Sequence, residues 1–298
     1  MTTPRRNRVD LHCHTTRSDG VLAPAELYAA ARGYGMRLVA ITDHDTLAGY
    51  RELRSAGLGA RPSAAGPELV PGVEINAAAP EIPDLWEGEL HILGFGVDPD
   101  DEAFEATLER QRTLRRERFS RIADRLRTLG MPVDDALHEA LPTDVSSAGR
   151  PHLARALVLA GHASSVDDAM ERVLARGAPA YEPRAGLGPR EAIEAIGRAG
   201  GLAALAHFPA APEREGLIRE LMGCGLRGLE VHYRGFDPAT VEAMSAFADR
   251  LGLVATGGSD YHGDTLTYAE AEQLTCVPDA VGVRFLATLA GVPARDRR

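Results

Sequence analysis

The chain has 298 residues, 44% of them hydrophobic and 26% charged, a composition typical of a soluble protein with one large domain or a domain carrying an insertion. The formal net charge of −10 argues against general binding to a nucleic-acid backbone. The sequence contains no lysine, which excludes a Walker P-loop, a Schiff-base enzyme and a metal bridge made by a carboxylated lysine. An anionic substrate must therefore be bound by arginine, histidine, backbone N–H groups or metal ions.

The cysteines and the N-terminus indicate a reducing compartment. Cys13, Cys224 and Cys276 lie far apart and form no C-x-x-C motif, so neither a disulfide framework nor a structural zinc site is indicated. No apolar signal-peptide region follows the N-terminal residues, and no apolar run approaches the roughly 18 residues of a membrane span. These features predict a cytoplasmic protein with no membrane partner.

Short apolar runs bounded by Gly, Pro or Asp alternate with amphipathic segments along most of the chain. Strands are predicted at 9–14, 38–43, 69–76, 90–96, 202–207, 228–233 and 253–257. Helices are predicted at 25–32, 47–56, 189–198, 213–222, 238–251 and 281–290. This alternation predicts an α/β fold with a parallel sheet, most simply an irregular closed barrel built from residues 8–97 and 183–290.

The alternation stops between residues 98 and 182, where the pattern predicts only helices, at 101–129, 133–139, 151–159 and 166–176. We therefore expect an all-helical insertion between the fourth and fifth strands. Its first helix carries eight arginines between Arg110 and Arg127, interleaved with acids at spacings that allow pairing along the helix. That pattern predicts a solvated helix face rather than a nucleic-acid surface. Three further histidines have no pattern around them and are expected to be structural or surface residues: His138, His162 and His232.

Histidines and acids gather at the ends of the predicted strands. His12 and His14 are two residues apart, so their imidazoles point to the same side of the first strand. In a parallel barrel the C-terminal ends of the strands meet at one face, where active sites form. The candidate metal ligands are His12, His14, Asp19, His44, Glu74, His91, His207, Asp260 and His262.

These nine side chains form a mixed nitrogen and oxygen set that suits zinc, manganese or iron. One ion cannot use all of them, so two or three ions are expected, and clustered divalent ions suit phosphate-ester hydrolysis. Other interpretations of single residues stay open at this point. Glu74 could be a buried acid paired with an arginine, Asp260 could cap a helix, and His91 lies early in its strand.

Five motifs in the barrel portion resemble the polymerase and histidinol phosphatase (PHP) domain family. They are His12-Cys-His14, Asp19-Gly20, Ile41-Thr-Asp-His44-Asp-Thr46, Pro71-Gly-Val-Glu74 and Ser259-Asp-Tyr-His262. The resemblance implies a distorted seven-stranded β/α barrel with a trinuclear metal centre, manganese being the expected metal and iron or zinc the alternatives. By this resemblance one ion is held by His12, His14, Glu74 and Asp260, a second by Glu74, His91 and His207, and a third by Asp19, His44 and His262. Some members have histidine where this chain has Asp19.

Two segments of the insertion resemble those of the 3′,5′-nucleoside bisphosphate phosphatases and the related 5′–3′ exoribonucleases. They are Gly149-Arg-Pro-His-Leu-Ala-Arg-Ala-Leu157 and Ala178-Pro-Ala-Tyr-Glu-Pro-Arg184. Arg150 and His152 would lie at the start of a helix, where backbone N–H groups and the helix dipole favour a phosphate. Arg176 or Arg184 would replace the lysine that the family often has nearby. The alternative is that Arg150 only pairs with a surface acid.

Together these features predict a metal-dependent phosphoesterase that removes the 3′-phosphate of a 3′,5′-nucleoside bisphosphate. Glu74, His207 and Asp260 are the expected catalytic residues, and Arg150, His152 and Arg184 are expected to bind substrate. The alternatives are a 5′–3′ exoribonuclease on short RNA, a small-metabolite phosphatase such as histidinol phosphatase, an amidohydrolase, and a non-catalytic metal-binding module. The expected partner is a small nucleotide or a short oligonucleotide, and no stable protein partner is implied.

Overall fold

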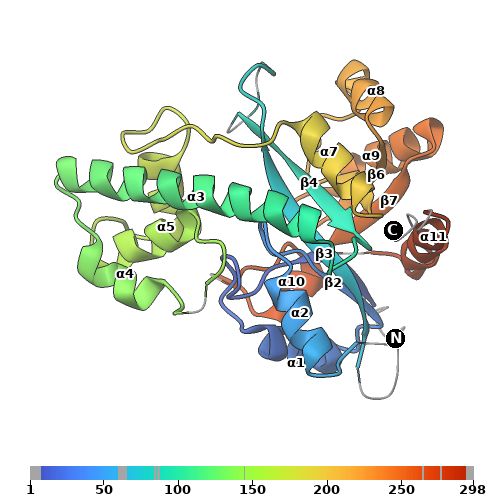
Figure 1. Ribbon diagram of the computed structural model, residues 1–298, viewed down its shortest axis with the longest axis horizontal. Coiled ribbons are helices and arrows are strands. Elements are labelled where there is room, and N and C mark those ends of the chain that lie inside the picture. Colours follow the sequence, from blue (N-terminus) through green and yellow to red (C-terminus); the bar gives the residue numbers. More distant parts are fainter. Residues whose placement is uncertain are drawn as a thin grey trace.

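The computed structural model describes residues 8–59, 66–83, 85, 88–143, 145–263, 265–275 and 277–292. Its strands form one seven-stranded sheet in chain order (Figure 1). They are β1 (Val9–Cys13), β2 (Leu38–Ile41), β3 (Glu68–Ala78), β4 (Glu89–Phe95), β5 (Leu202–Leu205), β6 (Leu226–Tyr233) and β7 (Val254–Gly258). Each of the seven predicted strands is therefore present. Residues 1–7 and Cys276, which entered the predictions above, lie outside the described residues.

The helices of the barrel portion lie close to their predicted ranges, with one addition. They are α1 (Pro24–Tyr34), α2 (Ala48–Ser55), α7 (Pro189–Arg198), α8 (Glu215–Gly223), α9 (Pro238–Leu251), α10 (Tyr268–Leu274) and α11 (Asp279–Ala290). The short α10 was not expected, although Thr267 and Glu270 form a capping box at its start. None of the described helices is both long and apolar enough to cross a membrane.

The expectation of an all-parallel sheet is wrong at β4, which runs antiparallel to both β3 and β5. The other neighbouring strands pair in parallel. The chain between Ala78 and Glu89 is too short for a helical crossover, whereas antiparallel strands can be joined by a short loop. Because β4 is reversed, its first residues lie at the edge where the parallel strands end. His91 therefore reaches that edge although it comes early in its strand.

The sheet closes almost completely into a barrel, because β1 meets the chain just after β7. The backbone N–H of Asp260 donates to the carbonyl of His12 at 2.7 Å, and that of His14 donates to the carbonyl of Tyr261 at 3.0 Å. A Cβ at Gly258 would lie 2.3 Å from the backbone nitrogen of His12, so only glycine allows this close approach. The predicted seven-stranded β/α barrel is confirmed.

The sheet packs against helices on its outside, and on its inside only one end of the barrel is filled with apolar residues. Alternate residues of each strand point inward or outward. The inward residues at one end of the barrel are apolar, among them Leu93, Phe95 and Ala204, and α11 closes that end with Phe285. Outward residues pack beneath the helices of the barrel portion. The inward residues at the other end are polar, and they include the predicted metal ligands.

The insertion consists of α3 (Glu102–Thr128), α4 (Asp134–Ala140), α5 (Arg150–Leu159) and α6 (Val166–Ala169), which continues as a π-helical turn (Met170–Leu174). Figure 1 shows α3 running from the barrel to the outer helices. The first turns of α3 pack on the barrel core through Phe104 and Leu108, and its last turns join a separate apolar cluster with α5 through Ile122 and Leu126. We propose that residues 98–182 form one inserted unit.

Candidate metal centre

The nine predicted metal ligands converge at the polar end of the barrel. His12 lies in β1, Glu74 in β3 and His91 in β4. The others stand on loops just after strands β1, β2, β5 and β7: His14, Asp19, His44, His207, Asp260 and His262. Six of the nine are buried, with 9% exposure or less, while the side chains of His91, His207 and His262 are 21%, 26% and 19% exposed.

Glu74 lies at the centre of the cluster and faces two groups of imidazoles. Its Oε2 atom is 3.4 Å from His12 Nε2, 3.2 Å from His14 Nε2 and 3.0 Å from His44 Nδ1. Its Oε1 atom is 2.8 Å from His91 Nδ1 and 3.2 Å from His207 Nε2. One carboxylate therefore joins two neighbouring sets of nitrogen atoms.

Two further carboxylates complete the arrangement. Asp260 Oδ1 lies 3.3 Å from the Nε2 atoms of both His12 and His14. On the other side of the cluster, Asp19 lies 3.5 Å from His44 Nε2 through Oδ2 and 3.4 Å from His262 Nε2 through Oδ1. The side chains thus form four overlapping groups, each with nitrogen and oxygen atoms close enough together to share one cation.

Unsatisfied buried atoms show that this donor set fits metal ions. Five atoms that face one another have no hydrogen-bond partner among the described residues: His12 Nε2, His14 Nε2, His44 Nδ1, Glu74 Oε2 and Asp19 Oδ1. Burying a polar atom without a partner costs about 1–3 kcal/mol, so five in one place call for a ligand. A divalent cation would satisfy nitrogen lone pairs and carboxylate oxygens together.

The charges of the cluster lead to the same conclusion. Burial alone would raise the pKa of Glu74, but His44, His12 and His91 hold it well below its usual range. Burial is likewise outweighed at Asp19 and Asp260, whose pKa values are well below the ordinary value because of the neighbouring histidines. The carboxylates are therefore ionised, and the buried negative charge needs compensation.

The pKa values of two histidines in the cluster are shifted in opposite directions. Burial lowers the pKa of His44 to about 3, so its imidazole is neutral and its lone pair is available. At His14 burial also lowers the pKa, but Asp260 and Glu74 raise it to about 10. A positive charge is thus favoured between Glu74 and Asp260, and either a proton or a metal cation can supply it.

The backbone is strained at two of the candidate ligands. His207 has φ of 29° and Asp260 has φ of 45°, in the left-handed region that residues other than glycine rarely adopt. Such conformations cost of the order of 1–3 kcal/mol each and concentrate at functional sites. Both residues stand just past a strand end, where the strained backbone turns the side chain toward the cluster.

The sequence analysis did not identify the residues that hydrogen-bond to the candidate ligands, or to the loop that carries them, and so orient them. Glu230 Oε1 lies 2.9 Å from His12 Nδ1, and the Tyr233 hydroxyl donates to Asp260 Oδ2 at 3.1 Å. Asp43 accepts a hydrogen bond of 2.7 Å from Ser18 Oγ in the loop between His14 and Asp19. A signal existed at Glu230, because an acid between the apolar Leu229 and Val231 must point inward in a strand of the barrel.

The expectation of a solvated arginine face on α3 is wrong for three residues. Arg112, Arg115 and Arg118 recur every third residue on one face of the helix and are buried, with 7%, 5% and 4% exposure. Arg115 donates to Asn76 Oδ1 at 2.7 Å and lies 3.4 Å from Asp19 Oδ2. The expectation holds on the opposite face, where 51% of the Arg116 side chain is exposed.

Three buried or partly buried guanidinium groups, those of Arg118, Arg150 and Arg184, gather beside the metal ligands, and this cluster is called the basic pocket below. Arg150 donates to Glu89 Oε1 at 3.0 Å, and Arg184 donates to Glu89 Oε2. Arg118 donates from Nε to the carbonyl of Glu182 at 2.8 Å, but its buried NH2 group has no partner among the described residues. Glu89 and His91 point to the same side of β4, so the basic pocket lies next to the second group of imidazoles.

The guanidinium groups of the basic pocket lie close enough together to repel one another. All three act on the carboxylate of Glu89, and Arg184 also lies 4.0 Å from Asp45 Oδ2. Burial, followed by repulsion from Arg184 and Arg150, lowers the pKa of Arg118 to about 9. The acid that pairs with Arg150 is thus a buried one that also pairs with Arg184. An anion would relieve this repulsion.

His152 lies at the start of α5, as predicted, but it does not carry a positive charge. It is fully buried, and its Nδ1 accepts a hydrogen bond of 3.1 Å from the backbone N–H of Gly149. Burial lowers its pKa to about 4, so the imidazole is neutral near pH 7. Its Nε2 atom has no partner within the described chain. His152 can therefore donate a hydrogen bond to an anion but cannot neutralise its charge.

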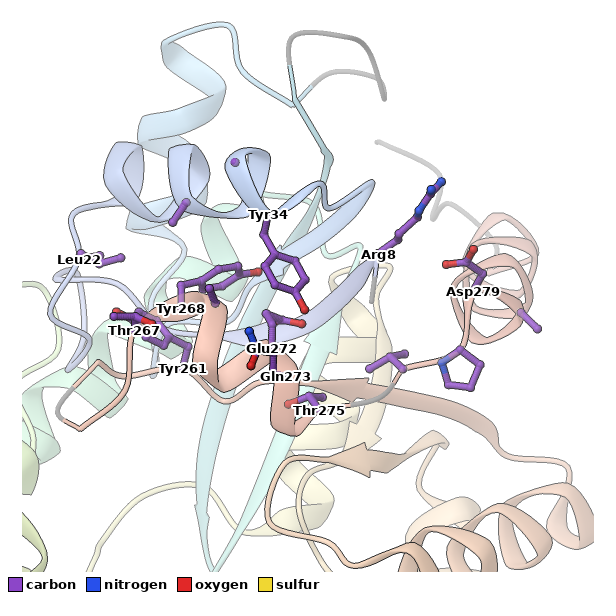
Figure 2. A pocket seen from close by; sticks show the side chains of 16 residues that line it. Arg8, Leu22, Tyr34, Tyr261, Thr267, Tyr268, Glu272, Gln273, Thr275 and Asp279 are labelled. Atoms are coloured by element: carbon purple, nitrogen blue, oxygen red, sulfur yellow. The ribbon is translucent and has the colours of Figure 1, made fainter. Parts of the chain in front are cut away.

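A large cavity lies elsewhere, between α1, α10 and the start of α11 (Figure 2). This cavity of about 1590 Å³ is lined by Tyr34, Tyr268 and Glu272 among others, and none of the nine candidate ligands borders it. Tyr268 donates to Asp10 Oδ2 at 2.9 Å on its inner wall. Since a large volume alone supplies no chemistry, we assign the functional site to the cluster at the strand ends.

Comparisons with known proteins agree with this geometry. Residues 10–172 match the PHP domain family. The chain is 34% identical over 261 residues to a 5′-3′ exoribonuclease of Haemophilus influenzae, with 86% of this chain and 90% of the relative covered. It is 31% identical over 265 residues to a 3′,5′-nucleoside bisphosphate phosphatase of Chromobacterium violaceum, with 85% and 87% covered.

A solved structure from Bifidobacterium adolescentis, described as a metal-dependent phosphoesterase, is similar over nearly the whole chain. It superposes with a TM-score of 0.80 at 32% identity, covering 94% of this chain and 95% of the other. The match extends across both the barrel and the insertion. From its motifs, its fold and these relatives, the chain belongs to the PHP domain family and is a metal-dependent phosphoesterase.

Proposed function

We propose that the protein hydrolyses the 3′-phosphate of a 3′,5′-nucleoside bisphosphate. The observation that carries this proposal is the basic pocket of Arg118, Arg150 and Arg184 beside the metal ligands. A substrate with two phosphates can place one at the metal centre and the other in the basic pocket. Guanidinium groups suit the second phosphate because they make bidentate, charge-assisted hydrogen bonds.

The metal centre is proposed to hold two to three divalent ions, with manganese expected first and iron or zinc as alternatives. The first group is His12, His14, Glu74 and Asp260; the second is Glu74, His91 and His207; the third is Asp19, His44 and His262. Such ions would activate water and stabilise charge on the phosphoryl oxygens.

The protein side chains have distinct roles in this proposal. Glu74 sets the spacing of two groups, because its two oxygens face different imidazoles. Asp260 orders the first group through His12 and His14. His207 is 26% exposed, so it lies where the leaving oxygen can approach, and it is our candidate for assisting that oxygen. Arg150, Arg184 and the Nε2–H of His152 would bind the phosphate that is not cleaved.

The second candidate function is a 5′–3′ exoribonuclease acting on short RNA. The Haemophilus influenzae relative, at 34% identity, favours it. An exonuclease of this polarity also needs a contact for a terminal 5′-phosphate, and the same basic pocket could provide it. The two candidates differ in how activity depends on chain length and on salt, since a longer RNA engages more phosphate contacts. Either nucleotide substrate agrees with the cytoplasmic location expected from the sequence.

A phosphate-release screen tests the proposal. Adenosine 3′,5′-bisphosphate, 3′-AMP, 5′-AMP, histidinol phosphate and p-nitrophenyl phosphate are compared with each of Mn²⁺, Fe²⁺ and Zn²⁺, alongside 5′-phosphorylated oligoribonucleotides. We expect the highest kcat/KM for the bisphosphate and a loss when either phosphate is removed. A higher kcat/KM for oligonucleotides would favour the exoribonuclease, and equal values for 3′-AMP and the bisphosphate would remove the role of the basic pocket.

A further inference from the structure

Strand β6 contributes none of the nine candidate ligands, yet one of its side chains touches two of them. Glu230 is fully buried and points inward, because Leu229 and Val231 on either side of it pack in the outer core. An ionised carboxylate inside a barrel is costly unless its oxygens are hydrogen-bonded. Both oxygens of Glu230 are used, and each serves a different strand.

The first contact is with the ring of His12. Glu230 Oε1 lies 2.9 Å from His12 Nδ1. A carboxylate only accepts hydrogen bonds, so Nδ1 must carry the proton, and the lone pair of the neutral ring then lies on Nε2. His12 Nε2 is the atom that faces Glu74 and Asp260, at 3.4 Å and 3.3 Å. Glu230 therefore fixes both the tautomer and the orientation that a metal ligand requires.

The second contact is with the backbone of His207. The His207 N–H donates to Glu230 Oε2 at 2.7 Å. His207 is held at φ of 29°, a conformation that persists only where surrounding contacts enforce it. One carboxylate thus restrains a ligand of the first metal group and a ligand of the second.

We propose that Glu230 is a positioning residue that sets the metal affinity of this centre, by holding His12 and His207 in their ligand geometry. The inference rests on the proposed metal assignment. Carboxylate partners of ligating histidines commonly act in this way, and losing one reduces metal affinity by about 10- to 100-fold. Glu230 touches neither substrate nor the reacting atoms in this proposal.

The test is the metal affinity of Glu230→Gln. Glutamine keeps the size of the side chain, but its NH₂ group must face either His12 Nδ1–H or the His207 N–H, so one hydrogen bond becomes a contact between two donors. We expect manganese affinity, measured by chelator competition in the absence of substrate, to fall by about 10- to 100-fold. Circular dichroism of the metal-free variant should match that of the wild type, which separates positioning from folding.

Thr256→Val is the matched control. Thr256 is the residue of β7 that pairs with Glu230 across the sheet, it is equally buried, and its hydroxyl has no hydrogen-bond partner among the described residues. This nearly isosteric change should leave manganese affinity within about twofold of the wild type, because no hydrogen bond is lost. An equal loss of affinity in both variants would assign the effect to packing and overturn the proposal.

The outcomes separate this inference from the proposed function. Failure of the wild type to bind manganese, iron or zinc would refute the metal assignment itself. Tight binding by the wild type and by Glu230→Gln alike would refute only the role of Glu230. If Glu230→Gln does not fold, a crystal structure of the manganese-loaded wild type decides. The proposal requires the ion on His12 Nε2 with Glu230 still bonded to Nδ1, and an ion on Nδ1 overturns it.

Discussion

The polar end of the barrel and the facing side of the insertion are both buried and charged, but with opposite sign. At the barrel, Asp19, Glu74 and Asp260 are ionised among histidines and leave atoms without partners. Where the insertion meets the barrel, Arg118, Arg150 and Arg184 lie around the carboxylate of Glu89, and one nitrogen of Arg118 has no partner among the described residues. Each region leaves buried polar atoms without a partner, and each calls for a different ligand.

This difference in charge indicates that the two regions bind different chemical groups. A cluster of imidazoles and carboxylates suits cations, whereas crowded guanidinium groups suit a phosphate. A substrate with two phosphates connects the regions, since one phosphate can meet the ions while the other meets the arginines. Damage to the barrel cluster should therefore reduce the chemistry on every substrate, and damage to the basic pocket should change the choice of substrate.

The largest effect is expected for Glu74→Gln, which removes the central carboxylate from the cluster at the polar end of the barrel. A carboxylate that faces two metal groups sets their spacing, and an amide is a poor bridge. We expect kcat/KM to fall by more than about 100-fold on every phosphomonoester, beyond the loss typical of an outer contact. His138→Ala, an exposed residue of α4, is the control and should be nearly silent. Turnover like that of the wild type would remove Glu74 from the centre.

A selective effect is expected from the basic pocket. Arg150→Ala and Arg118→Ala should each raise KM for a 3′,5′-bisphosphate and affect p-nitrophenyl phosphate much less, because a remote contact helps only a substrate that carries the second phosphate. Losing one charge-assisted pair costs on the order of 2–3 kcal/mol, or about 30- to 150-fold in kcat/KM.

Arg116→Ala is the matched control for Arg118→Ala, since it removes an exposed arginine from the same helix. This variant should change kcat/KM by no more than about twofold on either substrate. Equal losses on both substrates in Arg150→Ala would instead make Arg150 part of the reacting centre. No loss on either substrate would leave it a structural partner of Glu89.

The smallest effect concerns the pH dependence of His152. Its folded pKa of about 4 lies below the ordinary 6.5, so burial of the neutral ring stabilises the fold above pH 6.5, and this stabilisation is lost as the pH falls toward 4. Between pH 6.5 and 8.5 the ring does not change charge. The ratio of kcat/KM for the wild type to that for His152→Asn, measured on the bisphosphate, should stay constant over this range. A ratio that rises severalfold toward pH 6.5 would show that the charged imidazolium binds the phosphate.

The fold and the candidate ligands could be predicted because their signals are local. Each strand is a short apolar run, and the ligands follow strand ends in motifs such as His12-Cys-His14. The reversal of β4 was missed because apolar content does not encode strand direction. The short connection after Ala78 was the one available clue.

Arg150 and Arg184 were expected to bind substrate, but the contribution of α3 to the basic pocket through Arg118 could not be predicted in the same way. Arg115 and Arg116 are adjacent in sequence, with acids within reach of both, yet one is buried against Asp19 and the other is exposed. Which face of α3 is covered depends on how the insertion packs on the barrel, and that is a tertiary property. Glu230 was missed for a related reason, because its role depends on hydrogen bonds to two residues far away in sequence, His12 and His207.

The most direct test is the metal content of the purified protein, together with the dependence of its activity on metal ions. Protein prepared with manganese supplied should contain two to three ions per chain by elemental analysis, because the nine clustered ligands are more than one ion can use. Removing them with a chelator should abolish phosphate release, and adding manganese back should restore it. One ion or fewer per chain with full activity would contradict the multinuclear centre on which the proposed function rests.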